Sequence, residues 1–212
     1  MEIIDYKCVY FTFGRFQPPT TGHADNFKAV ASKAGKCDYY IYMSQSVDKK
    51  GSNPLPVDRK LYYAKKMFPN LKDKIRSAKG PVEVLSELQS QGYDDAYLVV
   101  GSDRVGAMQW VKKYNGKDYT FRKIEVISSG ERDADGDTFS ISGTKMRRAA
   151  AAGDFQSFKA GIPKGLGPKE TRNLMDENSR TVINKTVMKL EFDEIFQRFQ
   201  NDTQRGQGSE RP

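Results

Sequence analysis

Residues 11–23 contain a strand that stops at a glycine, a turn with two prolines, and the start of a helix. The apolar run over residues 8–13 is typical of a buried strand and ends at Gly14, and Thr20 or Thr21 can cap the helix that follows. The single histidine of the protein, His23, lies in the first helical turn. A strand, a tight turn and a helix N-terminus direct free backbone N–H groups at one point. The stretch therefore predicts an anion site.

The rest of the chain alternates between strand-like and helix-like segments. Further strands are predicted near residues 38–44, 74–78, 96–100 and 123–128, and helices over 57–68, 81–91, around Trp110 and up to residue 152. Such alternation favours a parallel sheet with helices on both faces. We expect an α/β fold: a Rossmann-like, doubly wound parallel sheet of five strands with a C-terminal helical extension.

The predicted main domain covers residues 1–163. Residues 161–169 are rich in glycine and proline and suggest a linker, so residues 164–200 are predicted to be a linker with a helical extension. That extension carries an apolar stripe at helical spacing, formed by Phe192, Ile195, Phe196 and Phe199. We expect the stripe to pack on the main domain, with a homo-oligomer or partner contact as the alternative. Residues 201–212 are predicted to be disordered.

Composition limits the partners and the compartment. The chain has 212 residues and a formal net charge of +8, but its lysines are scattered, which is typical of a solvated surface and does not favour a nucleic-acid partner. Cys8 and Cys37, with one histidine, are too few for a structural zinc site and are interpreted as buried thiols. No long apolar run or signal peptide is evident, so we expect a cytoplasmic protein without a membrane partner.

A second polar turn matches the first in chemistry. Ser142, Gly143 and Thr144 offer hydroxyls and helix N-terminal amides for phosphates, and Arg147, one helical turn later, offers a guanidinium for bidentate contact. Gly101 and Asp103 follow another buried strand, where Asp103 either contacts a ligand or caps the next helix. In a doubly wound sheet these turns lie together at the carboxyl ends of the strands.

The two turns carry a resemblance to a known family. The pattern Gly-x-Phe-x-Pro-x-Thr-x-Gly-His over residues 14–23, with Ile-Ser-x-Thr-x-x-Arg over residues 141–147, resembles the nucleotidylyltransferase superfamily of adenylyl- and cytidylyltransferases. The wording Gly-Arg-Phe-Gln-Pro is similar to nicotinamide mononucleotide adenylyltransferases. The longer run also resembles nucleotidyltransferases encoded by tailed phages, which would place the protein in the host cytoplasm. The resemblance covers about residues 8–163.

The resemblance implies an enzyme that transfers AMP or CMP from ATP or CTP to a phosphorylated small molecule, with Mg²⁺ bound to the nucleotide and no metal ligands of its own. The implied catalytic residues are His23, Thr20 and Arg147. The implied nucleotide-binding residues are Gly14, Arg15, Phe16, Gly22, Gly101, Asp103, Ser142 and Thr144. Arg59 and Trp110 are candidates for acceptor binding, against the alternatives of a solvated charge and a core tryptophan. Nicotinamide mononucleotide is the first acceptor to consider; a cytidylyltransferase acting on an alcohol or sugar phosphate, or a nucleotide-binding module without activity, are the alternatives.

Overall fold

The structure is a computed structural model that describes residues 6–47, 54–130 and 141–179. Five parallel strands form one sheet in the order β3-β2-β1-β4-β5. Their bounds are β1 Cys8–Gly14, β2 Asp38–Ser44, β3 Ile75–Ala78, β4 Asp95–Val100 and β5 Lys123–Ser128. The order reverses between β1 and β4, so the predicted doubly wound Rossmann-like sheet is confirmed.

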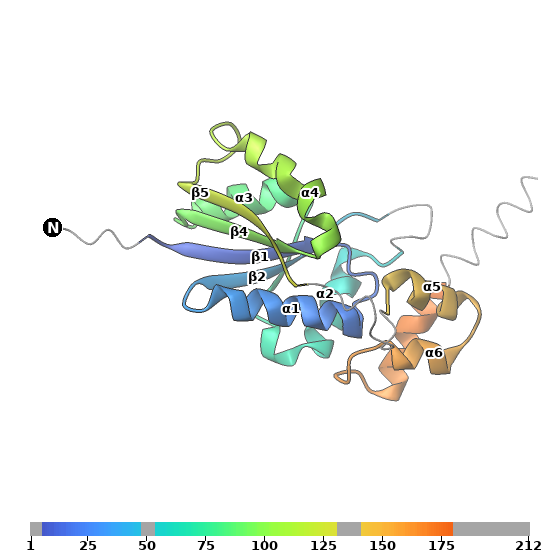
Figure 1. Cartoon of the computed structure of the whole chain (residues 1–212). Coiled ribbons are helices and arrows are strands. Elements are labelled where there is room, and N and C mark those ends of the chain that lie inside the picture. Colours follow the sequence, from blue (N-terminus) through green and yellow to red (C-terminus); the bar gives the residue numbers. More distant parts are fainter. Residues whose placement is uncertain (1–5, 48–53, 131–140, 180–212) are drawn as a thin grey trace, which may run out of the picture.

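Helices cover both faces of this sheet (Figure 1). The α-helices are α1 Thr21–Ala34, α2 Val57–Met67, α3 Pro81–Ser90, α4 Val105–Met108, α5 Gly143–Ala151 and α6 Phe155–Ala160, and residues 168–179 are also helical. Short 3₁₀ helices lie at η1 Pro69–Leu71, η2 Ser102–Arg104 and η3 Gln109–Tyr114. Helices α5 and α6 lie beyond the carboxyl ends of the strands (Figure 1).

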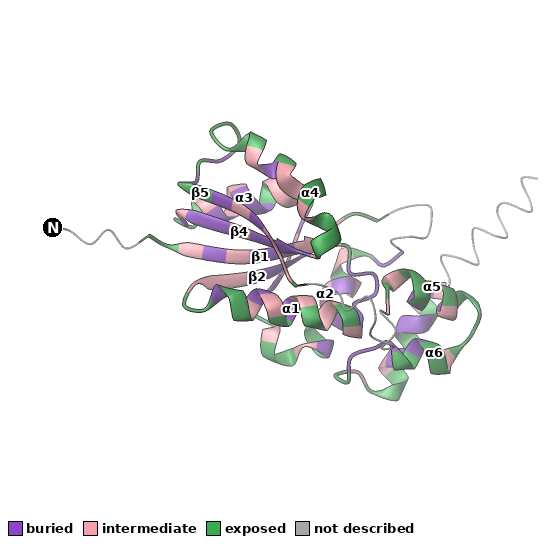
Figure 2. Ribbon diagram, viewed as in Figure 1, coloured by how far each residue is buried: buried purple, intermediate pink, exposed green. Residues whose placement is uncertain are grey.

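The side chains of β2 alternate between two apolar cores, one on each face of the sheet. Phe11, Tyr42 and Leu98 point to the face covered by α3 and α4, where they pack with Leu85. Ile41 and its neighbours on the other face pack with residues of α1 and α2. The strands are accordingly the most buried part of the molecule, while the outward faces of the helices are exposed (Figure 2). A sheet buried on both faces explains why β1, β2 and β4 are nearly continuous apolar runs.

The region around Trp110 differs from the predicted single helix. It consists of η2, α4 and η3 in succession. Val105, Met108 and Val111, which pack on the α3 side of the sheet, recur every three residues. That spacing is the period of a 3₁₀ helix, and it keeps one apolar row against the core without a regular α-helix.

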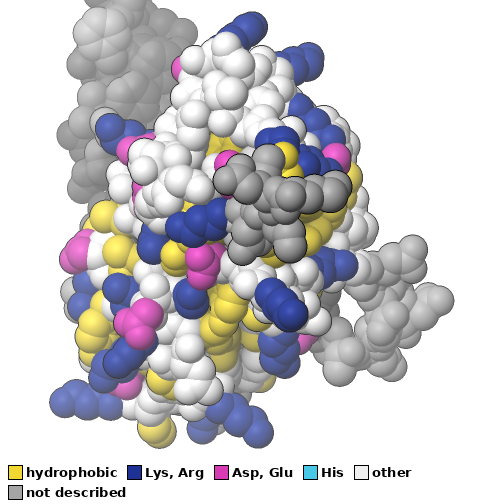
Figure 3. Space-filling view, turned by 90° about the vertical axis from the view of Figure 1, so that its left-hand side faces the viewer, with side chains coloured by type: hydrophobic (Ala, Val, Ile, Leu, Met, Phe, Trp, Pro, Cys, Tyr) yellow, Lys and Arg dark blue, Asp and Glu magenta, His cyan; other side chains and the backbone are white. Residues whose placement is uncertain are grey.

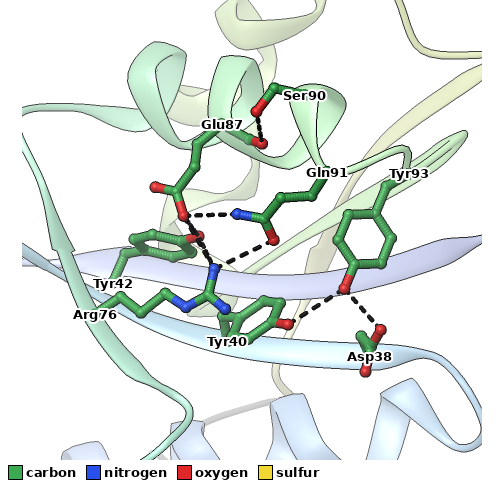
Figure 4. A network of polar contacts seen from close by, with 8 residues as sticks. All are labelled: Asp38, Tyr40, Tyr42, Arg76, Glu87, Ser90, Gln91 and Tyr93. Carbon is green, nitrogen blue, oxygen red and sulfur yellow. Dashed lines mark hydrogen bonds and ion pairs between the residues drawn. The ribbon is translucent and has the colours of Figure 1, made fainter.

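A polar network fixes α3 to the sheet (Figure 4). The Glu87 carboxylate accepts hydrogen bonds from the Tyr42 hydroxyl at 3.0 Å and from the Arg76 guanidinium at 2.9 Å. The Tyr93 hydroxyl donates to Asp38 at 2.6 Å. Burial is the main cause that raises the pKa of both Tyr42 and Tyr93 well above the ordinary value. Both phenols are therefore neutral donors at physiological pH.

A third apolar core joins α2, α5, α6 and the helix over residues 168–179. Here the glycine- and proline-rich segment that suggests a linker is packed against the domain. A Cβ on Gly165 would lie 2.5 Å from the carbonyl oxygen of Lys66, and Ile162 is buried. Gly165 permits this close packing, so residues 161–167 are not a free connection between two bodies. The domain boundary at residue 163 remains a prediction.

Cys8 and Cys37 form a disulfide, and the interpretation as buried thiols was wrong. The reason is the strand pairing: Val9 is the register partner of Asp38, so the residues before them, Cys8 and Cys37, are also neighbours, with Cα atoms 5.1 Å apart. Sequence alone does not show that β1 and β2 are adjacent. The disulfide closes a loop that contains the whole of α1 and the turn before it.

The amino-terminal edge of the sheet faces the viewer in Figure 3, where lysines and arginines are scattered among acidic and apolar side chains. Several are paired, such as Arg122 with Asp95 and Lys74 with Asp38. Within the described ranges, no helix is long and apolar enough to cross a bilayer. The predicted apolar stripe at residues 192–199 and the predicted disordered tail lie outside the described residues.

Candidate active site

The candidate site lies where β1 and β4 meet at the carboxyl edge of the sheet. Gly14 is the last residue of β1, and Gly101 directly follows β4. β1 and β4 are neighbours in the sheet, but the chain continues from β1 toward one edge of the sheet and from β4 toward the other. Ligands of doubly wound sheets bind where the strand order reverses in this way. Asp103 is exposed in η2 at the same edge. The structure thus brings together the three predicted residues Gly14, Gly101 and Asp103 at one edge.

The turn after β1 is folded tightly by Phe16. Its backbone φ is +45°, in the left-handed region that non-glycine residues rarely adopt. The Phe16 ring covers Gly14, where a Cβ would lie 2.7 Å from the ring. The ring is 6% exposed and makes edge contacts with the His23 and Phe27 rings. Phe16 therefore packs against the His23 ring from within the core.

Thr20 and His23 form a reciprocal cap at the start of α1. The Thr20 hydroxyl accepts from the His23 N–H at 3.4 Å, and the Thr20 N–H donates to His23 Nδ1 at 3.1 Å. Because Nδ1 accepts this bond, the proton of the neutral ring is on Nε2. Because Thr20 is fully buried, it fixes the orientation of the His23 ring from the interior of the protein. The capping box thus makes Nε2–H the donor of the ring.

The second predicted turn begins α5. Ser142 caps this helix by accepting from the Lys145 N–H at 3.3 Å, and both Ser142 and Thr144 are exposed. The Arg147 guanidinium donates to the Thr144 hydroxyl at 3.1 Å. Hydroxyls, a guanidinium and the N-terminal amides of α5 therefore gather at one place, which suits an anion.

The two turns contact each other directly. Arg147 donates to the main-chain carbonyl of Gln17 at 2.6 Å. A Cβ on Gly143 would lie 2.7 Å from the same oxygen, and one on Gly22 would lie 3.4 Å from the Ile141 carbonyl. Close approach therefore requires glycine at position 143. The predicted convergence of the two motifs is present, with the Gln17 carbonyl at the junction.

Arg59 and Trp110, the candidates for acceptor binding, lie in other surroundings. Arg59 forms an ion pair with Glu177 at 2.5 Å and donates to the Tyr63 hydroxyl at 2.9 Å, and the bond to Glu177 raises the pKa of the guanidinium. Arg59 thus ties α2 to the helix over residues 168–179. Trp110 is 37% exposed and contacts the Tyr114 ring edge-on, so it is not a core residue. Arg15 is exposed beside the first turn.

Sequence reasoning missed Lys60 at this edge. Its side chain is fully buried, and its ammonium donates at 2.8 Å to each of the carbonyls of Ser44 and Ser46. Lys60 thereby holds the chain where β2 ends, next to β1. A lysine in an amphipathic helix is normally predicted to be exposed. The one signal in the sequence for burial of Lys60 is its helical spacing of three and four residues from Tyr63 and Ala64, which are buried on α2.

Comparisons with known proteins agree with this geometry. A family model described as cytidylyltransferase-like matches residues 11–149. A nicotinic acid mononucleotide adenylyltransferase from Plasmodium falciparum, solved with NaAD, is similar with a TM-score of 0.55 and 16% identity, covering 81% of this chain and 98% of that one. The same protein solved with APC gives a TM-score of 0.54 at 16% identity and the same coverage.

A protein from Vibrio parahaemolyticus assigned as a nicotinate-nucleotide adenylyltransferase is similar with a TM-score of 0.50 and 14% identity, covering 80% of this chain and 99% of that one. No curated protein matches the chain by sequence. At these identities the likeness to the solved structures shows the fold. The match over residues 11–149 spans both turns of the site.

Proposed function

Because the chain belongs to the cytidylyltransferase-like family of nucleotidyltransferases, we propose that it transfers AMP or CMP from a nucleoside triphosphate to a phosphorylated small molecule and releases pyrophosphate. The observation that carries this proposal is the junction of the two turns: the Thr20-oriented His23 begins one helix, and Arg147 links the other to the Gln17 carbonyl. Two helix N-termini and a guanidinium around one point suit a chain of phosphates.

The proposed reaction is an in-line displacement. A phosphate oxygen of the acceptor attacks the α-phosphorus of the nucleotide, and the bond from that phosphorus to the bridging oxygen breaks as pyrophosphate leaves. His23 donates its Nε2–H to a non-bridging α-phosphoryl oxygen and stabilises the negative charge there. Ser142, Thr144 and Arg147 bind the β- and γ-phosphates, and Gly22 in the first turn of α1 permits close approach of the backbone to the triphosphate. No covalent enzyme intermediate is required.

We propose that a magnesium ion arrives with the nucleotide. Among the described residues, no group of three histidine, cysteine or carboxylate side chains is placed to hold a metal ion. Mg²⁺ commonly keeps several waters and binds substrate phosphates. The magnesium ion would neutralise charge on the triphosphate, while His23, Ser142, Thr144 and Arg147 orient the triphosphate.

Nicotinamide mononucleotide is the first acceptor to test. We propose that Gly101 and Asp103 lie on the acceptor and base side of the site, since both follow β4 at the point where strand order reverses. The exposed Trp110 ring, further along the chain in η3, is a candidate for stacking on a planar base. A cytidylyltransferase acting on an alcohol or sugar phosphate is the second candidate.

The test measures pyrophosphate release with MgATP or MgCTP against nicotinamide mononucleotide, nicotinic acid mononucleotide, and a series of sugar and alcohol phosphates. We expect turnover for one nucleotide and one acceptor class. Melting of the protein is followed in parallel, because a ligand that binds the native state raises Tm. If nucleotide raises Tm but no pair turns over, the chain is a nucleotide-binding module and the proposed activity is wrong.

A further inference from the structure

Gln17 lies between the two turns of the site but has no role in the reaction described above. Its main-chain carbonyl accepts from Arg147, and the same oxygen is the nearest atom to the Cβ position of Gly143. The residue is 2% exposed. Gln17 is therefore the point at which the segment with His23 and the segment with Arg147 touch.

The side-chain amide of Gln17 is buried without partners. Neither Oε1 nor Nε2 has a hydrogen-bond partner in the structure, and both atoms are shielded from solvent. In each of the other described residues with an orphaned buried atom, the second polar atom is bonded: Asn26 donates to Thr12, Asp95 accepts from Arg122, and Asn178 donates to the Leu174 carbonyl. Within the described ranges, Gln17 alone leaves a whole amide unsatisfied.

An unsatisfied buried amide is costly, and the turn that holds it is strained as well. Each orphaned buried donor or acceptor keeps the full cost of its lost hydration. The preceding residue, Phe16, has a φ of +45°, a conformation that is unfavourable for a non-glycine residue. Such strained or unsatisfied groups persist where the surrounding structure holds them in place, and they cluster at active sites and ligand sites.

We propose that Gln17 is a nucleotide-binding residue whose amide gains its partners when the phosphate chain enters the site. In this arrangement the phosphates attract the Arg147 guanidinium, the Phe16–Gln17 turn relaxes, and Gln17 Nε2–H donates to a phosphate oxygen. Gln17 Oε1 then accepts from the guanidinium that the main-chain carbonyl releases. The inference rests on the proposed function, since it takes the ligand to be the nucleotide triphosphate.

The experiment compares the wild type with Gln17→Met, a side chain of similar length without hydrogen-bonding groups. Without ligand, the variant should melt about 3 °C higher, because it removes the unsatisfied amide. With MgATP, MgCTP or inorganic pyrophosphate, titration calorimetry should show binding weakened about tenfold, the loss of one good hydrogen bond. Gln156→Met, at an exposed position on α6, should change neither quantity.

Opposite movement of stability and affinity is the distinguishing result. A higher Tm with unchanged affinity would show that the amide is only a buried defect and would overturn the inference, as would a lower Tm, which would mean that the amide is satisfied in solution. If the wild type binds none of the three ligands, the proposed function fails together with this role. If the wild type turns over substrate and Gln17→Met binds nucleotide as tightly as the wild type, the role of Gln17 alone is wrong.

Discussion

At the scale of single residues, Gly143 sets the distance between the two turns. Any side chain at position 143 would collide with the Gln17 carbonyl, 2.7 Å from the Cβ position, and with Arg147 Nη1 at 3.1 Å. We expect Gly143→Ala to displace α5 and Arg147 and to lower kcat/KM for the nucleotide by up to about 10²-fold, as a shift near 1 Å can. Steady-state kinetics measure this change.

Gly80→Ala is the matched control for Gly143. Gly80 has extended backbone and no atom within 4 Å of its Cβ position, so its substitution should leave kcat/KM unchanged. Equal activity of Gly143→Ala and the wild type would show that the approach of the two turns does not matter for the reaction.

The disulfide gives a second prediction at this scale. Cys8 and Cys37 close a loop of 29 residues that includes the turn and helix of the first motif. Loop-closure entropy predicts that a reduced or Cys8→Ser, Cys37→Ser protein is less stable by about 3–4 kcal/mol. Urea unfolding with and without reductant measures the difference. If the reductant does not change the urea concentration at the unfolding midpoint of the wild type, the disulfide does not form in solution.

Some residues of the candidate site could be predicted from the sequence and others could not. Thr20, His23, Ser142 and Arg147 could be predicted because the motif fixes their spacing at two helix starts, and the structure brings them to one edge. Gln17 and Lys60 could not, since their importance comes from burial and from contacts between distant segments. The inward packing of the Phe16 ring on His23 and Phe27 was not predicted either, and the nucleotide-binding role of Phe16 stays a prediction.

At the scale of elements, the helix over residues 168–179 belongs to the core that holds α5. Leu174 is fully buried there, although it lies beyond the residues matched by the family model. Leu174→Ala should lower the free energy of unfolding by about 3 kcal/mol through lost packing and the cavity left behind.

Asn173→Ala, on the exposed side of the same helix, is the control and should change stability by less than about 0.5 kcal/mol. Chemical denaturation of both variants provides the comparison. Equal stability would mean that this helix does not pack as described. A loss of nucleotide affinity in Leu174→Ala at a temperature where it remains folded would further link this core to the position of Arg147.

Helices and strands could be predicted where the local sequence pattern determines the secondary structure. The five strands were found within two residues, because apolar β-branched and aromatic runs bounded by turn residues indicate buried strands. The change from α4 to a 3₁₀ helix within Val105–Tyr114 was not predicted. Its apolar residues recur every three positions over only a few turns, and so short a pattern resembles that of an α-helix. Residues 161–167 resemble a linker, because glycine serves close packing as well as flexibility.

At the scale of the whole molecule, buried tyrosines limit stability in alkali. Burial is the main cause that raises the pKa of Tyr119 from 10.0 to about 12, and that raises the pKa values of Tyr42, Tyr63 and Tyr93 further. Each folded pKa exceeds the unfolded one, so the stabilisation is complete below about pH 10 and is lost as pH rises through the folded values.

We therefore expect stability to fall steeply above about pH 10, with these four tyrosines ionising only as the protein unfolds. Ultraviolet absorbance of tyrosinate, recorded together with circular dichroism over a pH titration, measures both events. Ionisation of all tyrosines before any loss of circular dichroism would contradict the buried network shown in Figure 4.

The central claim is that His23 stabilises charge on the α-phosphate, and pyrophosphate release by His23→Ala tests it most directly. With the nucleotide and acceptor that the wild type uses, the variant should lose about 10²–10³-fold in kcat, the loss typical of one removed charge-stabilising donor. Nucleotide affinity should change little, because Arg147 and the second turn remain. A His23→Ala enzyme with the kcat of the wild type would contradict the account.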